Sequence, residues 1–166
     1  MKKILKSHYQ LPATSYQLGF TIVDLTVILA CVFIAFAVVL SAFSAARASA
    51  RDARRVADVK QVQEALKLYR NDCESYPNQT VVLRGQALSS GGMDCGEGGF
   101  TSIVGGGVLY MKNSPAAPTP SDGCADGASD YVYSGAGDSY SISFCLGTET
   151  KGFIPGPHKA TENGIN

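Results

Sequence analysis

The fold of this chain is decided by the stretch Gly19-Phe20-Thr21-Ile22-Val23-Asp24-Leu25, which opens a long apolar run. From Phe20 to Ala46 that run contains one charged residue, Asp24, and neither proline nor glycine. A helix needs about 20 apolar residues to cross a bilayer, so the run is long enough to form a transmembrane helix. A passive anchor requires no small residue in front of it and no carboxylate near its start. These features therefore predict a function beyond anchoring.

Charged residues are distributed unevenly along the 166 residues, although the formal net charge is zero. Residues 1–19 carry three lysines and no acid, whereas residues 73–166 carry four basic and nine acidic residues. By the positive-inside rule the basic N-terminus stays in the cytoplasm, so we expect a single membrane crossing and an exported C-terminal head. The acidic balance of that head argues against binding nucleic acid through it.

The cysteines agree with export. Cys31 lies inside the apolar run, and the head contains the other four: Cys73, Cys95, Cys124 and Cys145. An even number of cysteines in a small Gly-rich exported domain predicts two disulfides, for which three pairings are possible. We favour the sequential pairing, Cys73–Cys95 and Cys124–Cys145, because it closes the shorter loops. A zinc site is the alternative, but the sequence has no C-x-x-C motif.

Residues 1–19 are interpreted as a processed leader that is basic, then polar, and ends in Gly19. No hydrophobic segment precedes Gly19, so this leader is not an ordinary signal peptide cleaved at that point. Two other export signals compete with it. Ala48-Ser49-Ala50 resembles a signal-peptidase site, but the apolar run before it is longer than the roughly 7–15 residues of a signal peptide. Ile28-Leu29-Ala30-Cys31 resembles a lipoprotein signal, but cleavage there would not explain Asp24.

The helix is predicted to continue beyond Ala46, because residues 47–72 are good helix formers without glycine or proline. Apolar side chains recur in this half at the spacing of an amphipathic helix: Val56, Val59, Val62, Leu66, Tyr69 and Cys73. Basic residues are predicted to lie on the other faces: Arg51, Arg54, Arg55 and Lys60. They form either a solvated surface or ion pairs with the acidic heads of neighbouring copies.

The head is predicted to contain a β-hairpin. Residues 84–107 are glycine-rich and are interpreted as a loop, followed by a short apolar element at 108–111 and a Pro-rich segment. Two strands, 131–133 and 140–146, flank a glycine-containing turn. Apolar residues alternate with serines in the second strand, so one of its faces is expected to pack on the helix stripe. The tail, 147–166, is expected to be irregular.

These patterns predict an α+β fold in which a long N-terminal helix packs on a small C-terminal antiparallel sheet. The chain divides into a leader at 1–19, a transmembrane half-helix at 20–46, an amphipathic half-helix at 47–73 and the exported head at 74–166.

The opening stretch resembles the prepilin motif of type IV pilins and type II secretion pseudopilins. It shares a basic leader ending in glycine, a phenylalanine next, an acid at the fifth mature position and a following apolar run. The resemblance implies a pilin-like fold, cleavage after Gly19 by a prepilin peptidase and methylation of Phe20. The second half of the helix, with Tyr76-Pro77 after it, is similar to the major pseudopilin of the G type. One departure is Asp24, because the acid of the family is typically glutamate.

The resemblance further implies a structural subunit with no catalytic activity of its own. Such a subunit is stored in the inner membrane and polymerised into an extracytoplasmic helical filament of identical copies. Its partners are an assembly-platform membrane protein with its ATPase, and other minor pilins. We favour a type II secretion pseudopilus that supports protein secretion. The alternatives are a type IV pilus subunit for adhesion, motility or DNA uptake, and a membrane-tethered secreted enzyme or lipoprotein.

Asp24 is expected to act in assembly. A carboxylate in apolar surroundings is unfavourable unless it is paired, so intramembrane acids are usually functional. After cleavage, Phe20 has a free α-amine four residues away, in the same subunit or a neighbour. Pairing with that amine would make docking selective for one register. The alternative is that Asp24 simply lies at the level of the lipid headgroups.

A metal site is the remaining hypothesis for the head. Asp122, Asp126 and Asp130 lie close together in the sequence before and at the start of the hairpin, and carboxylate oxygens suit Ca²⁺. Pseudopilins of the G type often carry a calcium ion in this region, so the resemblance implies one here. The spacing does not match an EF-hand loop, and solvated turn residues are the alternative interpretation.

Overall fold

The computed structural model describes residues 19–92, 95–96, 98–103, 105–125 and 127–166. It contains one long helix, α1 (Ile22–Cys73), followed by antiparallel strands, so the predicted α+β class is confirmed. Contacts divide the chain into two units, Met1–Ser41 and Ala42–Asn166, and all the strands belong to the second. The leader prediction for residues 1–18 lies outside the described part of the chain.

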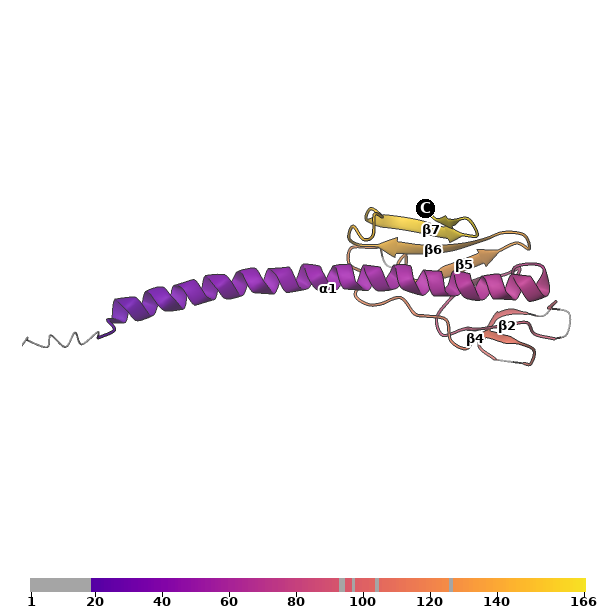
Figure 1. Ribbon diagram of the computed structural model, residues 1–166, viewed down its shortest axis with the longest axis horizontal. Helices are drawn as coiled ribbons and strands as arrows, with labels where there is room; N and C mark the ends of the chain where they lie inside the picture. Colours follow the sequence, from indigo (N-terminus) through magenta and orange to yellow (C-terminus); the bar gives the residue numbers. More distant parts are fainter. Residues whose placement is uncertain (1–18, 93–94, 97, 104, 126) are drawn as a thin grey trace, which may run out of the picture. The chain divides into compact units, whose positions relative to one another are not determined.

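The strands of the head form two sheets, and every pair of neighbours is antiparallel (Figure 1). The larger sheet has the order β1-β5-β6-β7-β8, with the bounds β1 (Thr80–Val82), β5 (Val132–Gly135), β6 (Tyr140–Leu146), β7 (Gly156–Thr161) and β8 (Gly164–Ile165). The smaller sheet has the order β3-β2-β4, with the bounds β3 (Gly99–Thr101), β2 (Ala87–Ser89) and β4 (Leu109–Met111). The predicted hairpin is β5–β6.

The core of the head forms between the second half of α1 and the sheets. The predicted helix stripe is buried, with Val56, Val59, Val62 and Leu66 at 0% exposure. It joins one cluster with the apolar face of β6, whose side chains also face inward: Tyr140, Ile142, Phe144 and Leu146. Each large side chain buried in this way contributes roughly 1.5–3 kcal/mol relative to exposure. Packing against the sheet therefore stabilises this half of the helix.

Two local predictions are wrong. The segment 84–107, interpreted as a loop, contains β2 and β3, and β2 is buried along its whole length. The tail 147–166, expected to be irregular, contains β7 and β8, and β7 pairs with β6 over six residues. In β7, His158 and Ala160 are buried while Pro157 and Lys159 are exposed. His158 is polar and the prolines at 155 and 157 favour turns, so the sequence of this segment does not predict a strand.

Both disulfides follow the sequential pairing, Cys73–Cys95 and Cys124–Cys145. The first joins the end of α1 to the glycine-rich segment. The second joins β6 to the segment before β5. The prediction made from loop length is therefore confirmed.

We expect replacement of Cys124 and Cys145 together by serine to lower the stability of the head by about 3 kcal/mol. The reason is that the bridge closes a loop with a sequence separation of 21 residues and so restricts the unfolded chain. Urea unfolding of the double variant beside the parent protein measures the difference. A midpoint equal to that of the parent would contradict the prediction.

Candidate functional site

The first candidate site is the start of α1, where Thr21 and Asp24 cap the helix. The Thr21 carbonyl accepts the first helical hydrogen bond, from Leu25 N at 3.2 Å. Asp24 N donates to Thr21 Oγ1 at 3.2 Å, while Thr21 N and Oγ1 donate to Asp24 Oδ2 at 3.0 and 2.9 Å. This reciprocal arrangement is a capping box, which satisfies backbone N–H groups that have no helical partner. Asp24 therefore stabilises the helix start as well as supplying a charge.

The junction between Gly19 and Phe20 lies just outside the helix. Phe20 is 84% exposed, and a side chain at Gly19 would meet no atom within 4 Å. Helix α1 begins two residues later, at Ile22. The peptide bond at which the prepilin resemblance predicts cleavage thus lies in exposed, non-helical chain, which a protease active site can accommodate.

The apolar run that follows is exposed along its length. Its large side chains, from Phe20 to Phe43, are 47–84% exposed. By length and composition, α1 is the one helix among the described residues that can cross a membrane. Small side chains also occur along the run, and such residues allow close approach of helices in lipid: Ala30, Ala35, Ala37, Ala42, Ala45 and Ala46.

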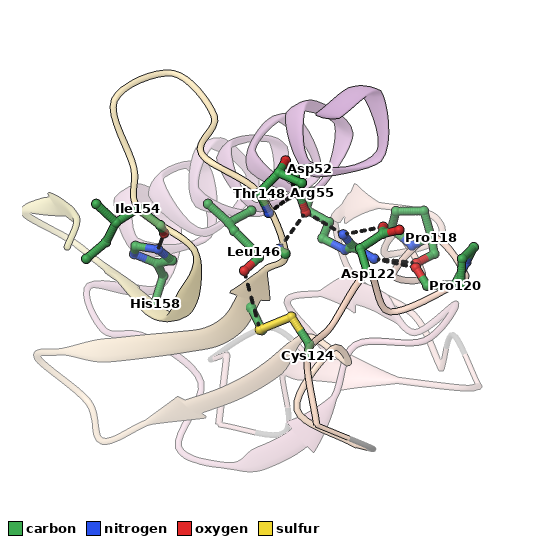
Figure 2. The surroundings of a disulfide bond; sticks show 12 residues. Asp52, Arg55, Pro118, Pro120, Asp122, Cys124, Leu146, Thr148, Ile154 and His158 are labelled. Atoms are coloured by element: carbon green, nitrogen blue, oxygen red, sulfur yellow. Dashed lines mark hydrogen bonds and ion pairs between the residues drawn. A yellow bond between two sulfur atoms is a disulfide. The ribbon is translucent and has the colours of Figure 1, made fainter. Parts of the chain in front are cut away.

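The second candidate site is a buried network of ion pairs in the head, centred on Arg55 (Figure 2). Asp52 and Arg55 lie one turn apart on α1, and both side chains are 0% exposed. Arg55 pairs with Asp52 and with Asp122, the latter at 3.1 Å. Its other terminal nitrogen donates to the carbonyl oxygens of Pro118 and Pro120, at 2.9 and 2.8 Å. One guanidinium thereby holds the Pro-rich segment against the helix.

Asp52 connects the same network to the end of β6. Its carboxylate accepts hydrogen bonds from Thr148 N and Thr148 Oγ1, both at 2.7 Å, and from Gly147 N at 3.2 Å. Gly147 also passes close to the backbone of Asp122, where a Cβ would lie 2.0 Å from the Asp122 carbonyl oxygen, so a larger residue would not fit. The disulfide Cys124–Cys145 lies beside this junction (Figure 2). The network therefore joins three segments that are far apart in sequence.

Arg51 completes the network from the surface. It donates two hydrogen bonds to the Asp122 carboxylate, one of them from Nε at 2.7 Å. The interpretation of the basic residues as a solvated surface is thus wrong for Arg51 and Arg55, which pair with an acid of their own chain. Arg54, with 69% of its side chain exposed, and Lys60 do lie on the surface.

The network holds its carboxylates in the charged form. Hydrogen bonds from Arg51, then from Arg55, lower the pKa of Asp122 although partial burial opposes them. Burial by itself raises the pKa of Asp52, but hydrogen bonds from Thr148, Arg55 and Gly147 outweigh it and lower that pKa. Asp58 differs, because burial raises its pKa more than Tyr131 and Arg54 lower it.

We expect the stability of the head to fall in acid. Asp52 and Asp122 have lower pKa values folded than unfolded, so they contribute stability above the unfolded pKa of about 3.9. That contribution is lost as the pH falls through the folded values. The pKa of Asp58 is raised in the folded head, so this carboxylate changes the stability in the opposite direction. It is one carboxylate, whereas Asp52 and Asp122 are two. Urea unfolding of residues 42–166 between about pH 5 and pH 2 should show the loss. Asp122→Asn should make the slope shallower, and an unchanged slope would contradict this explanation.

The residues proposed for calcium have other contacts. Asp122 pairs with Arg51 and Arg55, and both carboxylate oxygens of Asp130 accept from Arg84, at 2.7 and 2.9 Å. Asp126 lies outside the described residues. Within the part of the chain that the structure describes, no three His, Cys, Asp or Glu residues are grouped as a metal site. Calcium binding remains a hypothesis, and an ion bound by Asp122 and Asp130 would have to displace guanidinium groups.

The sequence contained signals for the residues that were missed. Thr21-x-x-Asp24 matches the capping-box pattern immediately before an apolar run. Asp52 lies one turn before Val56 and Arg55 lies one turn before Val59, so both continue the buried helix stripe, where charged residues are unexpected. No pattern pointed to Asp122 as their partner. In comparisons with known proteins, no family profile, curated protein or solved structure matches this chain.

Proposed function

We propose that this chain is a structural subunit of a helical filament that is assembled at the inner membrane. In this proposal a prepilin peptidase cuts between Gly19 and Phe20 and methylates the new amine. The subunit waits in the membrane with its head outside. An assembly platform and its ATPase then add it to a type II secretion pseudopilus, alongside minor pilins.

One observation carries the proposal: an exposed Gly–Phe junction directly precedes a helix whose large apolar side chains are exposed throughout its first half. The large side chains from Phe20 to Phe43 are all at least 47% exposed. Such a surface is unfavourable in water and requires lipid or other apolar helices around it. A subunit that moves from a bilayer into a bundle of identical helices satisfies this requirement in both places.

Asp24 gives the assembly its register in this proposal. Its carboxylate lies at the helix start, beside the backbone that becomes the new N-terminus after cleavage. In a bundle of identical chains, each contact uses different surfaces on the two copies. Such contacts build a filament when the rotation that relates neighbouring copies does not close into a ring. A buried carboxylate without a cation would be unfavourable, so neighbours dock where an α-amine of Phe20 meets it.

Mass spectrometry of the mature chain tests the processing step. We expect an N-terminus at Phe20 that carries one additional methyl group. Deletion of the peptidase in the host should leave the leader attached, which serves as the control. Any other N-terminus contradicts the proposal, and a lipid on Cys31 would establish a lipoprotein instead.

A type IV pilus subunit is the alternative within the same class. A pseudopilus and a type IV pilus would use the same helix and the same cleavage, so only the length and the location of the filament distinguish them. Electron microscopy of the native assembly should show a short periplasmic filament for a pseudopilus and a long surface fibre for a pilus. A tethered enzyme would form neither.

A further inference from the structure

We propose that Asn163 is a site of spontaneous deamidation and that its isoaspartate product opens the hairpin formed by β7 and β8. Glu162 and Asn163 make the turn of this hairpin, and both residues are exposed. Of the five asparagines in the sequence, Asn163 is the one that precedes a glycine. The reaction needs this turn and water alone, so it is independent of the proposed function.

The turn places a glycine directly after Asn163. Gly164 has a φ of 127°, which glycine adopts readily and other residues rarely do, so the fold itself favours glycine here. No side chain shields the main-chain nitrogen of Gly164. Outside the adjacent residues, no described atom lies within 4 Å of the position that a Cβ would occupy. This nitrogen therefore meets little steric hindrance when it attacks the Asn163 side chain.

The side chain of Asn163 is weakly held. Its Nδ2 donates to Glu162 Oε1 at 3.4 Å, which is longer than the roughly 2.7–3.2 Å of a typical N–H···O bond. The exposed amide is therefore able to rotate toward the nitrogen of Gly164. Thr161 and Gly164 form the pair of the β7–β8 ladder next to the turn, so this end of the hairpin must open first. Because β8 is a short strand at the edge of its sheet, that opening has a low free-energy cost.

Three other exposed asparagines are followed by residues with a side chain and a hydrogen-bonded nitrogen: Asn71, Asn78 and Asn113. After Asn78, the nitrogen of Gln79 donates to Pro77 O at 3.1 Å. After Asn113, the nitrogen of Ser114 donates to Gln86 O at 2.7 Å. Asn71 and the residue after it lie inside α1, where main-chain N–H groups bond to the preceding turn. Asn163 is therefore expected to react first.

The reaction is an intramolecular substitution followed by hydrolysis. The Gly164 nitrogen attacks Asn163 Cγ, and the new C–N bond closes a succinimide ring. The bond between Cγ and Nδ2 breaks, and Nδ2 leaves as ammonia with the proton from the Gly164 nitrogen. Water then opens the ring. Cleavage of the bond to Cγ gives aspartate, whereas cleavage of the bond to the main-chain carbonyl carbon gives isoaspartate, in which the main chain runs through the side chain.

Isoaspartate lengthens the main chain of the turn by one methylene group, so the pairs between β7 and β8 lose their register. Ile165 of β8 packs against the core of the head, and the main-chain oxygen of Asn166 lies 3.0 Å from His158 Nδ1. Both contacts depend on β8 staying in place. The buried ring of His158 therefore loses a hydrogen-bond partner when the hairpin opens.

Peptide mapping of the full chain in detergent micelles, before and after prolonged incubation in mildly alkaline buffer, tests the site. We expect Asn163 to be converted while Asn71, Asn78 and Asn113 stay intact. In water enriched in a heavy oxygen isotope the product should carry one solvent oxygen, and electron-transfer dissociation should identify isoaspartate. Hydrogen exchange in β7 and β8 should then be faster in the aged protein than in the fresh protein. Asn163→Ser, incubated in the same way, is the matched control and should keep its original exchange.

Retention of Asn163, or conversion no faster than that of the other three asparagines, would overturn the assignment of the site. Conversion without faster exchange in β7 and β8 would overturn the opening of the hairpin. Faster exchange in the aged Asn163→Ser control would show that incubation itself opens the hairpin, which also contradicts the proposal.

Discussion

Asp24→Ala is expected to leave cleavage after Gly19 intact and to abolish filament assembly. The substitution removes the carboxylate that accepts hydrogen bonds from Thr21 and that is proposed to pair with the Phe20 amine of a docked copy. Without it, that amine would enter an apolar bundle unpaired, which is strongly unfavourable. Immunoblots of the mature chain and electron microscopy of sheared filaments measure the two steps separately.

Three further variants separate the charge from the cap. Thr21→Ala removes the Thr21 hydroxyl from the capping box and keeps the carboxylate, so filaments should persist. Asp24→Asn keeps a hydrogen-bond acceptor and removes the charge, so filaments should be lost. Asp24→Glu keeps the negative charge at this position, so filaments should form. Normal filaments from Asp24→Ala or Asp24→Asn would show that the charge has no role in assembly.

Arg55→Met is expected to have the largest effect on the stability of the head, about 3–5 kcal/mol. The substitution leaves Asp52 without its cation in a fully buried position and removes one of two cations from Asp122. It also removes the donors to Pro118 and Pro120, so the Pro-rich segment loses these two hydrogen bonds to α1. Thermal unfolding of residues 42–166 should show the melting temperature lowered by roughly 10–20 °C.

Arg54→Met is the matched control, because this arginine is on the same helix, is mostly exposed and has one long ion pair. Exposed ion pairs contribute about 0–1 kcal/mol, so its melting temperature should stay close to that of the parent. Replacing Asp52, Arg55 and Asp122 together with apolar residues of similar volume should recover much of the loss, because no buried charge is then left unpaired. Equal melting temperatures for Arg55→Met and Arg54→Met would contradict this explanation.

The network changes how the acidic residues of the head are understood. In sequence, Asp122, Asp126 and Asp130 suggested oxygen ligands for a metal ion. In the structure, Asp122 is the acceptor of two arginines from α1, and Asp130 is the acceptor of Arg84. Guanidinium groups of the same chain therefore pair with these two carboxylates.

The features of α1 that depend on neighbouring residues could be predicted from the sequence. The apolar run, the absence of helix breakers and the stripe from Val56 to Tyr69 all follow from spacing along one helix. The hairpin β5–β6 follows from strand alternation around a turn. The disulfide pairing followed from loop length. These predictions succeeded because each interaction is local or is limited to a few alternatives.

The remaining strands and the ion network were decided only by tertiary structure. β7 carries a buried histidine and a proline, and it is a strand because β6 offers it six residues of pairing. Arg55 is buried because Asp122 and two carbonyl oxygens, more than 60 residues away, converge on it. The sequence alone thus determined the helix and its capped start, since their contacts span a few residues. Which distant charged residues pair was determined only by the folded head. No local sequence pattern identifies a partner that lies far away in the sequence.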